Sequence, residues 1–173
     1  RRAAERRLQR AGPAQVYTMG SDGTDAELFV PFDFGVTGAT NGPEWSPEGT
    51  MLAFHREVSG SPQVFVMDVS GRRVRQLTSS GRNEDPTWAP DGRHVAFVSD
   101  RSGSTQIHVS WLDATDPGPI TNLTSPPAAP AWSPDGTHLA FTAEGDGSDA
   151  EDVYVQPVDR STKPVRILRM PND

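Results

Sequence analysis

Short apolar runs separated by polar, glycine-containing turns recur along this chain with a period of 43 to 44 residues. The clearest runs are PEWSPEGTMLAF (residues 43–54), PTWAPDGRHVAF (86–97) and PAWSPDGTHLAF (130–141). A second run follows each, as QVFVMDVSG from residue 63, QIHVSWLDA from 106 and DVYVQPVDR from 152. A third follows in turn, as VRQLT (74–78), ITNLT (120–124) and VRIL (165–168). An imperfect copy of the last two runs, at residues 15–23 and 26–30, opens the chain.

Each repeat resolves into four short β-strands. The first holds the Pro-x-Trp stretch, and a tight turn such as Pro134-Asp135-Gly136 leads to the second. In such a turn Pro presets φ, Asp bonds the backbone and Gly accepts a positive φ. The third strand is rich in β-branched and aromatic residues, and the fourth is short and edge-like. Because strands two and three are apolar on both faces, we expect each sheet to lie between neighbouring sheets.

Four antiparallel strands repeated every 40 to 45 residues are typical of a β-propeller blade. A β-sandwich would give turns at similar spacing but no self-similarity of this period. We therefore predict an all-β fold, a β-propeller of four-stranded antiparallel blades. The expected divisions are a basic N-terminal segment (1–14), a half blade with strands three and four (15–42) and three blades (43–85, 86–129 and 130–173).

The blade count is incomplete, because about three and a half blades fit into 173 residues whereas closed propellers usually have four to eight. Three explanations remain open at this point. The chain is a piece of a larger propeller, or it completes its ring with another chain, or it closes as an irregular four-bladed ring. An open sheet face or edge favours association in each of the first two cases.

Composition and charge limit the classes of partner and site that we expect for this chain. Glycine and proline, 16 of each, are the turn residues of the repeat, and the absence of cysteine excludes disulfides and cysteine-based sites. The first ten residues carry five arginines and one glutamate, so the formal net charge of −7 leaves the rest of the chain at −11. A body this acidic argues against nucleic-acid binding. No apolar run reaches the ~18 residues of a membrane-spanning helix.

The motif Pro-x-Trp-Ser-Pro-Asp-Gly-x-x-Leu-Ala-Phe resembles the TolB-type propeller repeat. The third copy matches it in full, and the first two copies differ from Trp-Ser-Pro-Asp-Gly at one position each. The matching residues, which the resemblance implies are scaffold, are Trp45, Pro47, Gly49, Trp88, Pro90, Asp91, Gly92, Trp132, Pro134, Asp135 and Gly136.

The resemblance implies a protein-binding scaffold in the periplasm or another extracytoplasmic compartment, with a cytoplasmic location not excluded. Similar repeats also occur in propellers that precede prolyl-oligopeptidase-type catalytic domains, in tricorn-like proteases and in some polysaccharide lyases. The alternative is therefore an accessory propeller that gates substrate for a hydrolase or lyase whose catalytic part lies outside this chain.

No motif for catalysis stands out in the sequence. There is no Gly-x-Ser-x-Gly elbow and no phosphate-binding loop. His94 and His138 share one repeat position where the first blade has Met51, so they are expected to be scaffold or surface. The acidic stretch 144–152 does not fit a calcium loop and is expected to be solvated. We expect no enzyme activity, no cofactor and no metal site in this chain.

The expected partners are proteins, or additional blades from the same or another chain. By the family's geometry, loops near 56–62, 80–86, 100–105, 125–130 and 144–151 lie at one end of the blades. Their polar residues, which we expect to be exposed, are the candidates for partner contact, by position only, namely Arg56, Arg82, Asn83, Asp85, Arg101, Asp146 and Asp149. The arginine-rich N-terminus is expected to be a solvated or connecting segment, with contact to a partner or to anionic lipid as the alternatives.

Overall fold

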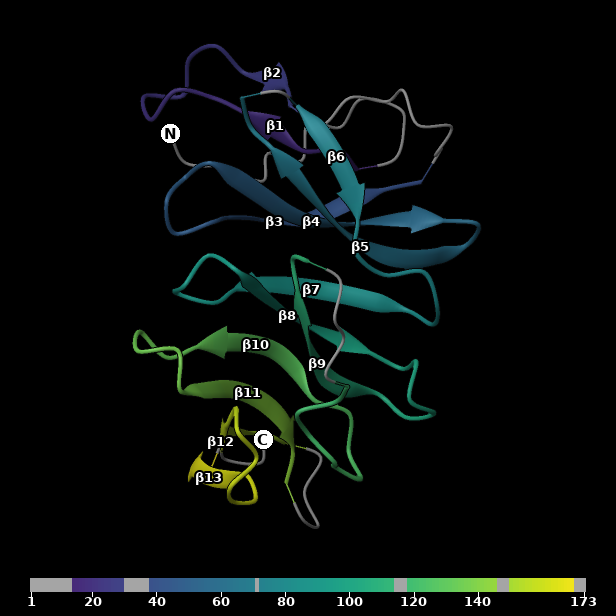
Figure 1. Ribbon diagram of the computed structural model, residues 1–173, viewed down its shortest axis with the longest axis vertical. Helices are drawn as coiled ribbons and strands as arrows, with labels where there is room; N and C mark the ends of the chain where they lie inside the picture. The colour runs from purple at the N-terminus through teal and green to yellow at the C-terminus, as the bar shows by residue number, and fades with distance from the viewer. Residues whose placement is uncertain (1–13, 30–37, 71, 114–117, 146–149, 170–173) are drawn as a thin grey trace.

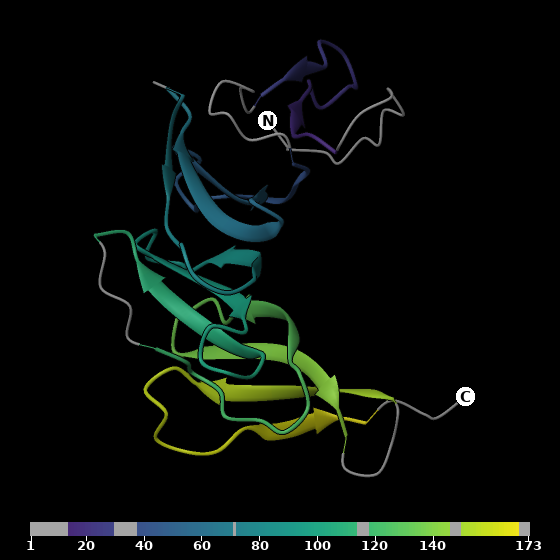
Figure 2. The same cartoon turned by 90° about the vertical axis from the view of Figure 1, so that its right-hand side faces the viewer.

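The computed structural model describes residues 14–29, 38–70, 72–113, 118–145 and 150–169. Its elements are antiparallel β-strands, grouped in sheets that stack one on the next along the long axis of the molecule (Figures 1 and 2). The all-β class and the four-stranded antiparallel blade are confirmed. Among these residues there is no helix with the length and hydrophobicity needed to cross a membrane.

The sheets follow the order of the repeats. A two-stranded sheet pairs β1 (Tyr17–Thr18) with β2 (Glu27–Leu28). The next, in the order β3-β4-β5-β6, comprises Thr40–Trp45, Met51–Val58, Ser61–Asp68 and Arg73–Gln76. A three-stranded sheet holds β7 (Asn83–Trp88), β8 (His94–Ser99) and β9 (Gln106–Trp111). The last, β10-β11-β12-β13, comprises Ala128–Trp132, His138–Glu144, Glu151–Pro157 and Val165–Leu168.

The centre of each larger sheet is a cross-strand pair of stacked rings. Phe54 faces Phe65, Phe97 faces His108 and Phe141 faces Tyr154, each pair directly opposite in the strand register. The ring centroids lie 5.7, 6.1 and 5.9 Å apart, with interplanar angles of 8°, 18° and 14°. Cross-strand aromatic pairs stabilise antiparallel sheets, so one repeated pair fixes the register of strands two and three in all three blades.

The predicted tight turns are present between strands one and two. In the second blade Gly92 N–H donates to the Ala89 carbonyl oxygen at 3.0 Å, and Gly92 has a φ of 65°. The equivalent Gly49 and Gly136 have φ of 69° and 72°. This left-handed conformation strains residues that carry a Cβ atom, which explains why the third residue of the turn is glycine in every copy.

The turn carboxylate is held ionised by the turn itself. Asp135 accepts hydrogen bonds from Ser133 Oγ at 2.6 Å, Thr137 N at 3.0 Å and Thr137 Oγ1 at 2.8 Å. These bonds favour the charged form and lower the pKa of Asp135 to about 2, with the Ser133 hydroxyl the largest cause. The ionised carboxylate of Asp135 therefore stabilises the fold at pH values above its ordinary pKa of 3.8. This contribution is lost as the pH falls through about 2.

Replacing Ser133 with alanine is expected to raise the pKa of Asp135 from about 2 toward 3.8. The variant lacks the hydrogen bond from the Ser133 hydroxyl, which is the largest cause of the lowered pKa. A carboxyl ¹³C NMR titration of the variant measures the shift directly. The second blade carries Ala89 at this position of its turn, so the substitution is compatible with the fold. An unchanged Asp135 titration would show that the serine contributes nothing.

The core lies between the sheets, in one apolar layer per junction. The layer between the first two sheets contains Val16, Phe29, Leu52, Phe54, Phe65 and Met67. The next contains Ala53, Val64, Val66, Trp88, Val95 and Phe97, and the last contains Ala96, Ile107, Val109, Ile120, Leu139, Phe141 and Ala143. Strands two and three of the first two blades are thus buried on both faces, as the sequence predicts. In the last blade β13 is exposed throughout, with Ile167 61% accessible.

The first strands of neighbouring blades are joined through their tryptophans. Trp88 Nε1 donates to the Glu44 carbonyl oxygen at 3.1 Å, and Trp132 Nε1 donates to the Thr87 carbonyl oxygen at 3.2 Å. The Glu44 carboxylate also accepts from Trp88 N at 3.2 Å, and burial raises the pKa of Glu44. In the second and third blades the repeated tryptophan therefore both packs in or against the core and donates a hydrogen bond to the preceding blade.

The fourth strand of the second blade differs from the prediction. Instead of a strand over residues 120–124, the described residues hold a single bridge between His108 and Pro119. Thr121, not Thr124, takes the place of Thr78 of the first blade. Thr78 Oγ1 accepts from Val64 N, and Thr121 Oγ1 accepts from Ile107 N, both at 2.9 Å. The sequence match of Leu77-Thr78 to Leu123-Thr124 is therefore offset by three residues from the structural alignment.

Candidate functional site

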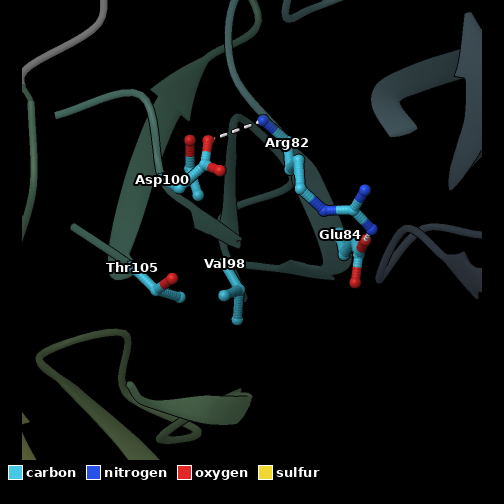
Figure 3. A pocket seen from close by; sticks show the side chains of 6 residues that line it. Arg82, Glu84, Val98, Asp100 and Thr105 are labelled. Atoms are coloured by element: carbon cyan, nitrogen blue, oxygen red, sulfur yellow. Dashed lines mark hydrogen bonds and ion pairs between the residues drawn. The ribbon is translucent and has the colours of Figure 1, made fainter. Parts of the chain in front are cut away.

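Two of the predicted loops meet at one end of the second blade. Arg82 N donates to Asp100 Oδ1 at 2.7 Å, and Asp100 N donates to the Arg82 carbonyl oxygen at 3.3 Å. Arg82 immediately precedes β7, and Asp100 immediately follows β8. Because Asn83 and Ser99 are paired in the register, the chain folds so that these two loop residues lie side by side (Figure 3).

An open pocket lies at this junction, and Figure 3 shows the side chains around it. Its lining residues are Arg82, Glu84, Val98, Ser99, Asp100 and Thr105. Arg82 Nη2 contacts Glu84 Oε1 at 2.6 Å, and the two side chains are 58% and 38% exposed. An ion pair this exposed adds only about 0–1 kcal/mol to stability, so both charged groups remain free to exchange this contact for one with a ligand.

Arg101, the next residue in the same hairpin, is held over an aromatic ring. Its guanidinium carbon lies 4.8 Å from the centroid of Phe97, and its Nε donates to His108 Nδ1 at 3.2 Å. This geometry is a cation–π contact that also covers the edge of the core. Arg101 is half-buried, so it fixes the hairpin to the blade and presents only part of its side chain to solvent.

The neighbouring Ser102 and His108 do not have the arrangement of a nucleophile and its base. Ser102 Oγ lies 3.3 Å from His108 Nε2, but an arginine only donates, so His108 Nδ1 carries the lone pair that Arg101 contacts. The neutral ring then has its proton on Nε2, where it donates to the serine oxygen. A histidine in this tautomer cannot take the serine proton at that nitrogen.

Two of the predicted contact residues are buried, and their expected exposure is wrong. Arg56 is 1% exposed, because β4 continues through it and places it opposite Thr40, to whose Oγ1 its Nε donates at 3.1 Å. Burial lowers the pKa of Arg56. Asn83 is fully buried, and its Nδ2 donates to the Ser80 carbonyl oxygen and to Gln63 Oε1. Arg56 thus joins β3 to β4 within one sheet, Asn83 joins two neighbouring sheets, and both side chains are buried away from a partner.

Besides the half-buried Arg101, the other candidates are either exposed or outside the described residues. Arg82 and Asp85 are exposed, and Asp85 sits in the strand-one bulge with a φ of 50° and donates its N–H to His55 Nδ1 at 3.2 Å. Asp146 and Asp149 lie outside the described residues. Asp152, at the end of the acidic stretch expected to be solvated, is instead 1% exposed and pairs with Arg166 Nη1 at 3.0 Å.

The sequence reasoning missed that Glu84, Asp100 and Thr105 line the same pocket as Arg82. The only signal available was that the loops 80–86 and 100–105 were expected at the same end of the blade. Within the part of the chain that the structure describes, no three His, Asp or Glu residues come together as a metal site. What the arrangement offers chemically is a set of charged, partly exposed groups on a rigid junction, suited to polar recognition.

Comparisons with known proteins agree with this fold. A family model described as the TolB beta propeller domain matches residues 34–168, and comparison with curated proteins gives no match. TolB from Acinetobacter baumannii is 28% identical with a TM-score of 0.74, covering 92% of this chain and 39% of its own. A putative TolB from Agrobacterium tumefaciens is 22% identical with a TM-score of 0.77, covering 91% of this chain and 57% of its own.

A puromycin-hydrolyzing peptidase from Mycobacterium tuberculosis also contains this fold, at 16% identity and a TM-score of 0.68, covering 92% of this chain and 28% of its own. The chain thus spans less than two thirds of each of these proteins, from 28% to 57% of their length. The family model, however, matches most of the chain, through the region that contains all three copies of the Trp-x-Pro-x-Gly turn. The chain therefore belongs to the TolB β-propeller domain family.

Proposed function

We propose that this chain is a non-catalytic, protein-binding propeller module, and that the pocket around Arg82 is part of its contact surface. The observation that carries the proposal is the half-exposed ion pair of Arg82 and Glu84 at an open pocket. The pocket lies between the loops 80–86 and 100–105, which are joined by hydrogen bonds between Arg82 and Asp100. These bonds hold the two loops in place, and charged groups presented on such a framework favour specific recognition by electrostatic complementarity. The similarity to TolB proteins supports a scaffold role and an extracytoplasmic location.

Neutralising the pair is expected to weaken partner binding about tenfold or more, since rim charges select the partner by complementarity. The variant is Arg82→Gln with Glu84→Gln, which retains side-chain size. Its matched control is Arg75→Gln on β6, which is also exposed but lies on the outer strand of the first blade. Tagged chains capture partners from cells, and the dissociation constant of each purified partner is then measured.

Equal affinity of the double variant and the control for every partner would refute this surface. The variants are expected to fold normally, because an exposed ion pair contributes at most about 1 kcal/mol. Thermal unfolding of each variant checks this before binding is compared.

The alternative function is an accessory propeller that positions substrate for a catalytic domain. The structural likeness to a peptidase that is much longer than this chain favours it. A polypeptide that joins this propeller to a Gly-x-Ser-x-Gly segment would support the alternative. Further propeller repeats with no such segment would support the binding module.

A further inference from the structure

The pocket beside Arg82 carries more negative than positive charge. Its lining holds the carboxylates of Glu84 and Asp100 and the guanidinium of Arg82, which contacts Glu84 Oε1 at 2.6 Å. Asp100 is partly buried, and its Oδ1 accepts a hydrogen bond from the uncharged Arg82 N at 2.7 Å. Among the described residues no basic side chain forms an ion pair with Asp100. A partly buried carboxylate without a counter-ion is costly, so a cation is favoured beside it.

The pocket has a structural cause, which a comparison with the first blade shows. Glu84 lies opposite Val98 in the strand register, and Val98 follows Ala96 by two residues, so these side chains face the last blade. The position of Val98 is taken in the first blade by His55, whose Nδ1 accepts a hydrogen bond from Asp85 N of the next blade at 3.2 Å. Valine is shorter and has no acceptor, so it does not reach across in this way, and the recess stays open.

The backbone around this recess is alike in the two blades. Asp100 N donates to the Arg82 carbonyl oxygen at 3.3 Å, and Glu57 N donates to the Ala39 carbonyl oxygen at 3.2 Å in the same register. Glu57 of the first blade therefore corresponds to Asp100 of the second. Because the backbones agree, the difference between the two positions lies in the side chains around them, and Glu57 is a matched reference for Asp100.

The lining of the pocket matches a long side chain with a cationic end. Val98 offers methyl groups and Thr105 a hydroxyl, and Figure 3 shows the Arg82 guanidinium turned toward Glu84 and away from Asp100. Lysine and arginine have an aliphatic stem that packs on apolar surface and a charged head that binds carboxylates. Beyond its first ten residues the chain has a net charge of −11, and a field of this sign attracts a basic partner.

We propose that this pocket receives a lysine or arginine side chain of a protein partner, with Asp100 as its counter-charge and Val98 under its aliphatic stem. The inference rests on the proposed function, because it names the chemistry of the partner at that same surface. The opposite pairing, a partner carboxylate on Arg82, is disfavoured. Such a carboxylate would have to displace Glu84 from Arg82 and would lie near two negative charges of the lining.

The test uses the full chain and the peptide Gly-Gly-Arg-Gly-Gly, acetylated and amidated so that its only charge is on the arginine. Backbone ¹⁵N NMR of the chain follows the amides of Asp100 and Thr105. The arginine peptide and its lysine counterpart are expected to give saturable shifts with a dissociation constant in about the millimolar range, weakening as salt is added. A citrulline peptide, which keeps the length of arginine without its charge, and a glutamate peptide are expected to give no saturable shift.

Asp100→Asn keeps an acceptor for Arg82 N but removes the charge, and it is expected to weaken binding of the arginine peptide about fivefold or more. The matched control is Glu57→Gln at the corresponding, exposed position of the first blade, which is expected to leave binding unchanged. Val98→His, which copies the side chain of the first blade into the pocket, is expected to weaken binding as well. Thermal unfolding confirms that each variant is folded before affinities are compared.

Equal binding of the arginine and citrulline peptides, or an unchanged affinity of Asp100→Asn, would overturn the inference. Saturable binding of the glutamate peptide in place of the arginine peptide would assign the pocket to an anion and would equally overturn it. The proposed function fails separately. If Arg82→Gln/Glu84→Gln loses its partners while the arginine peptide does not bind, only the inference fails. If the arginine peptide binds while that variant keeps full affinity for every partner, only the proposed function fails.

Discussion

Replacing Phe97 with alanine is expected to lower the free energy of unfolding by about 3–5 kcal/mol. Phe97 is fully buried in β8, in the apolar layer between the first two complete blades. Its ring also stacks on His108 and lies under the guanidinium of Arg101. Alanine would leave a cavity and would remove the surface on which Arg101 rests. Since small domains are stable by only about 5–15 kcal/mol, this is a large part of the total.

Urea unfolding followed by tryptophan fluorescence measures the change. Phe97→Leu is the matched control and is expected to lose clearly less, because it retains most of the apolar volume. Leu168→Ala is a second control, since Leu168 is 52% exposed in β13 and its removal is expected to change stability by under about 0.5 kcal/mol. A loss of under about 1 kcal/mol for Phe97→Ala would contradict the assigned packing.

The parts of the fold that were predictable are those for which every repeat carries the same local sequence signal. The Pro-Asp-Gly turn forms because glycine is available where φ is positive. The apolar strands form the layers because their residues are hydrophobic on both faces. These signals act over a few residues, and a period of 43 to 44 residues repeats them, so the blades could be read from the sequence alone.

The errors arose where a polar residue is buried by partners distant in the chain. Arg56 and Asn83 read as loop residues because their neighbours in sequence are polar. Their acceptors Thr40 and Gln63 lie 16 and 20 residues away, and only the strand register brings them together. The exposed members of the candidate site, Arg82 and Asp85, were predictable because each lies close to a turn, but their contacts with Asp100 and His55 were not.

Gln106 is expected to be the most sensitive polar position of the second blade. Its side chain is 3% exposed, and its Oε1 accepts from Thr121 Oγ1 at 2.7 Å and from Leu123 N at 3.0 Å. Its Nε2 donates to the Leu123 carbonyl oxygen at 2.9 Å. These bonds attach the segment that follows β9 to the blade. In that segment the only β-pairing among the described residues is the single bridge between His108 and Pro119. Gln63 makes the equivalent bond to Thr78 in the first blade.

Replacing Gln106 with leucine is expected to lower the free energy of unfolding by about 2–4 kcal/mol, because the buried Thr121 hydroxyl and the partly buried backbone groups of Leu123 lose their partner. Asn122→Leu is the control, since Asn122 is exposed in the same segment and its loss is expected to cost under about 0.5 kcal/mol. Gln106→Glu supplies a readout that a packing defect would not give. A buried carboxylate is costly when ionised, so this variant is expected to gain stability as the pH falls from 7 toward 5, where protonation restores a donor. Urea unfolding of this variant and of the unsubstituted chain, measured across this pH range, tests the expectation. If the stability of Gln106→Glu changes with pH no differently from that of the unsubstituted chain, the hydrogen-bonding role is contradicted.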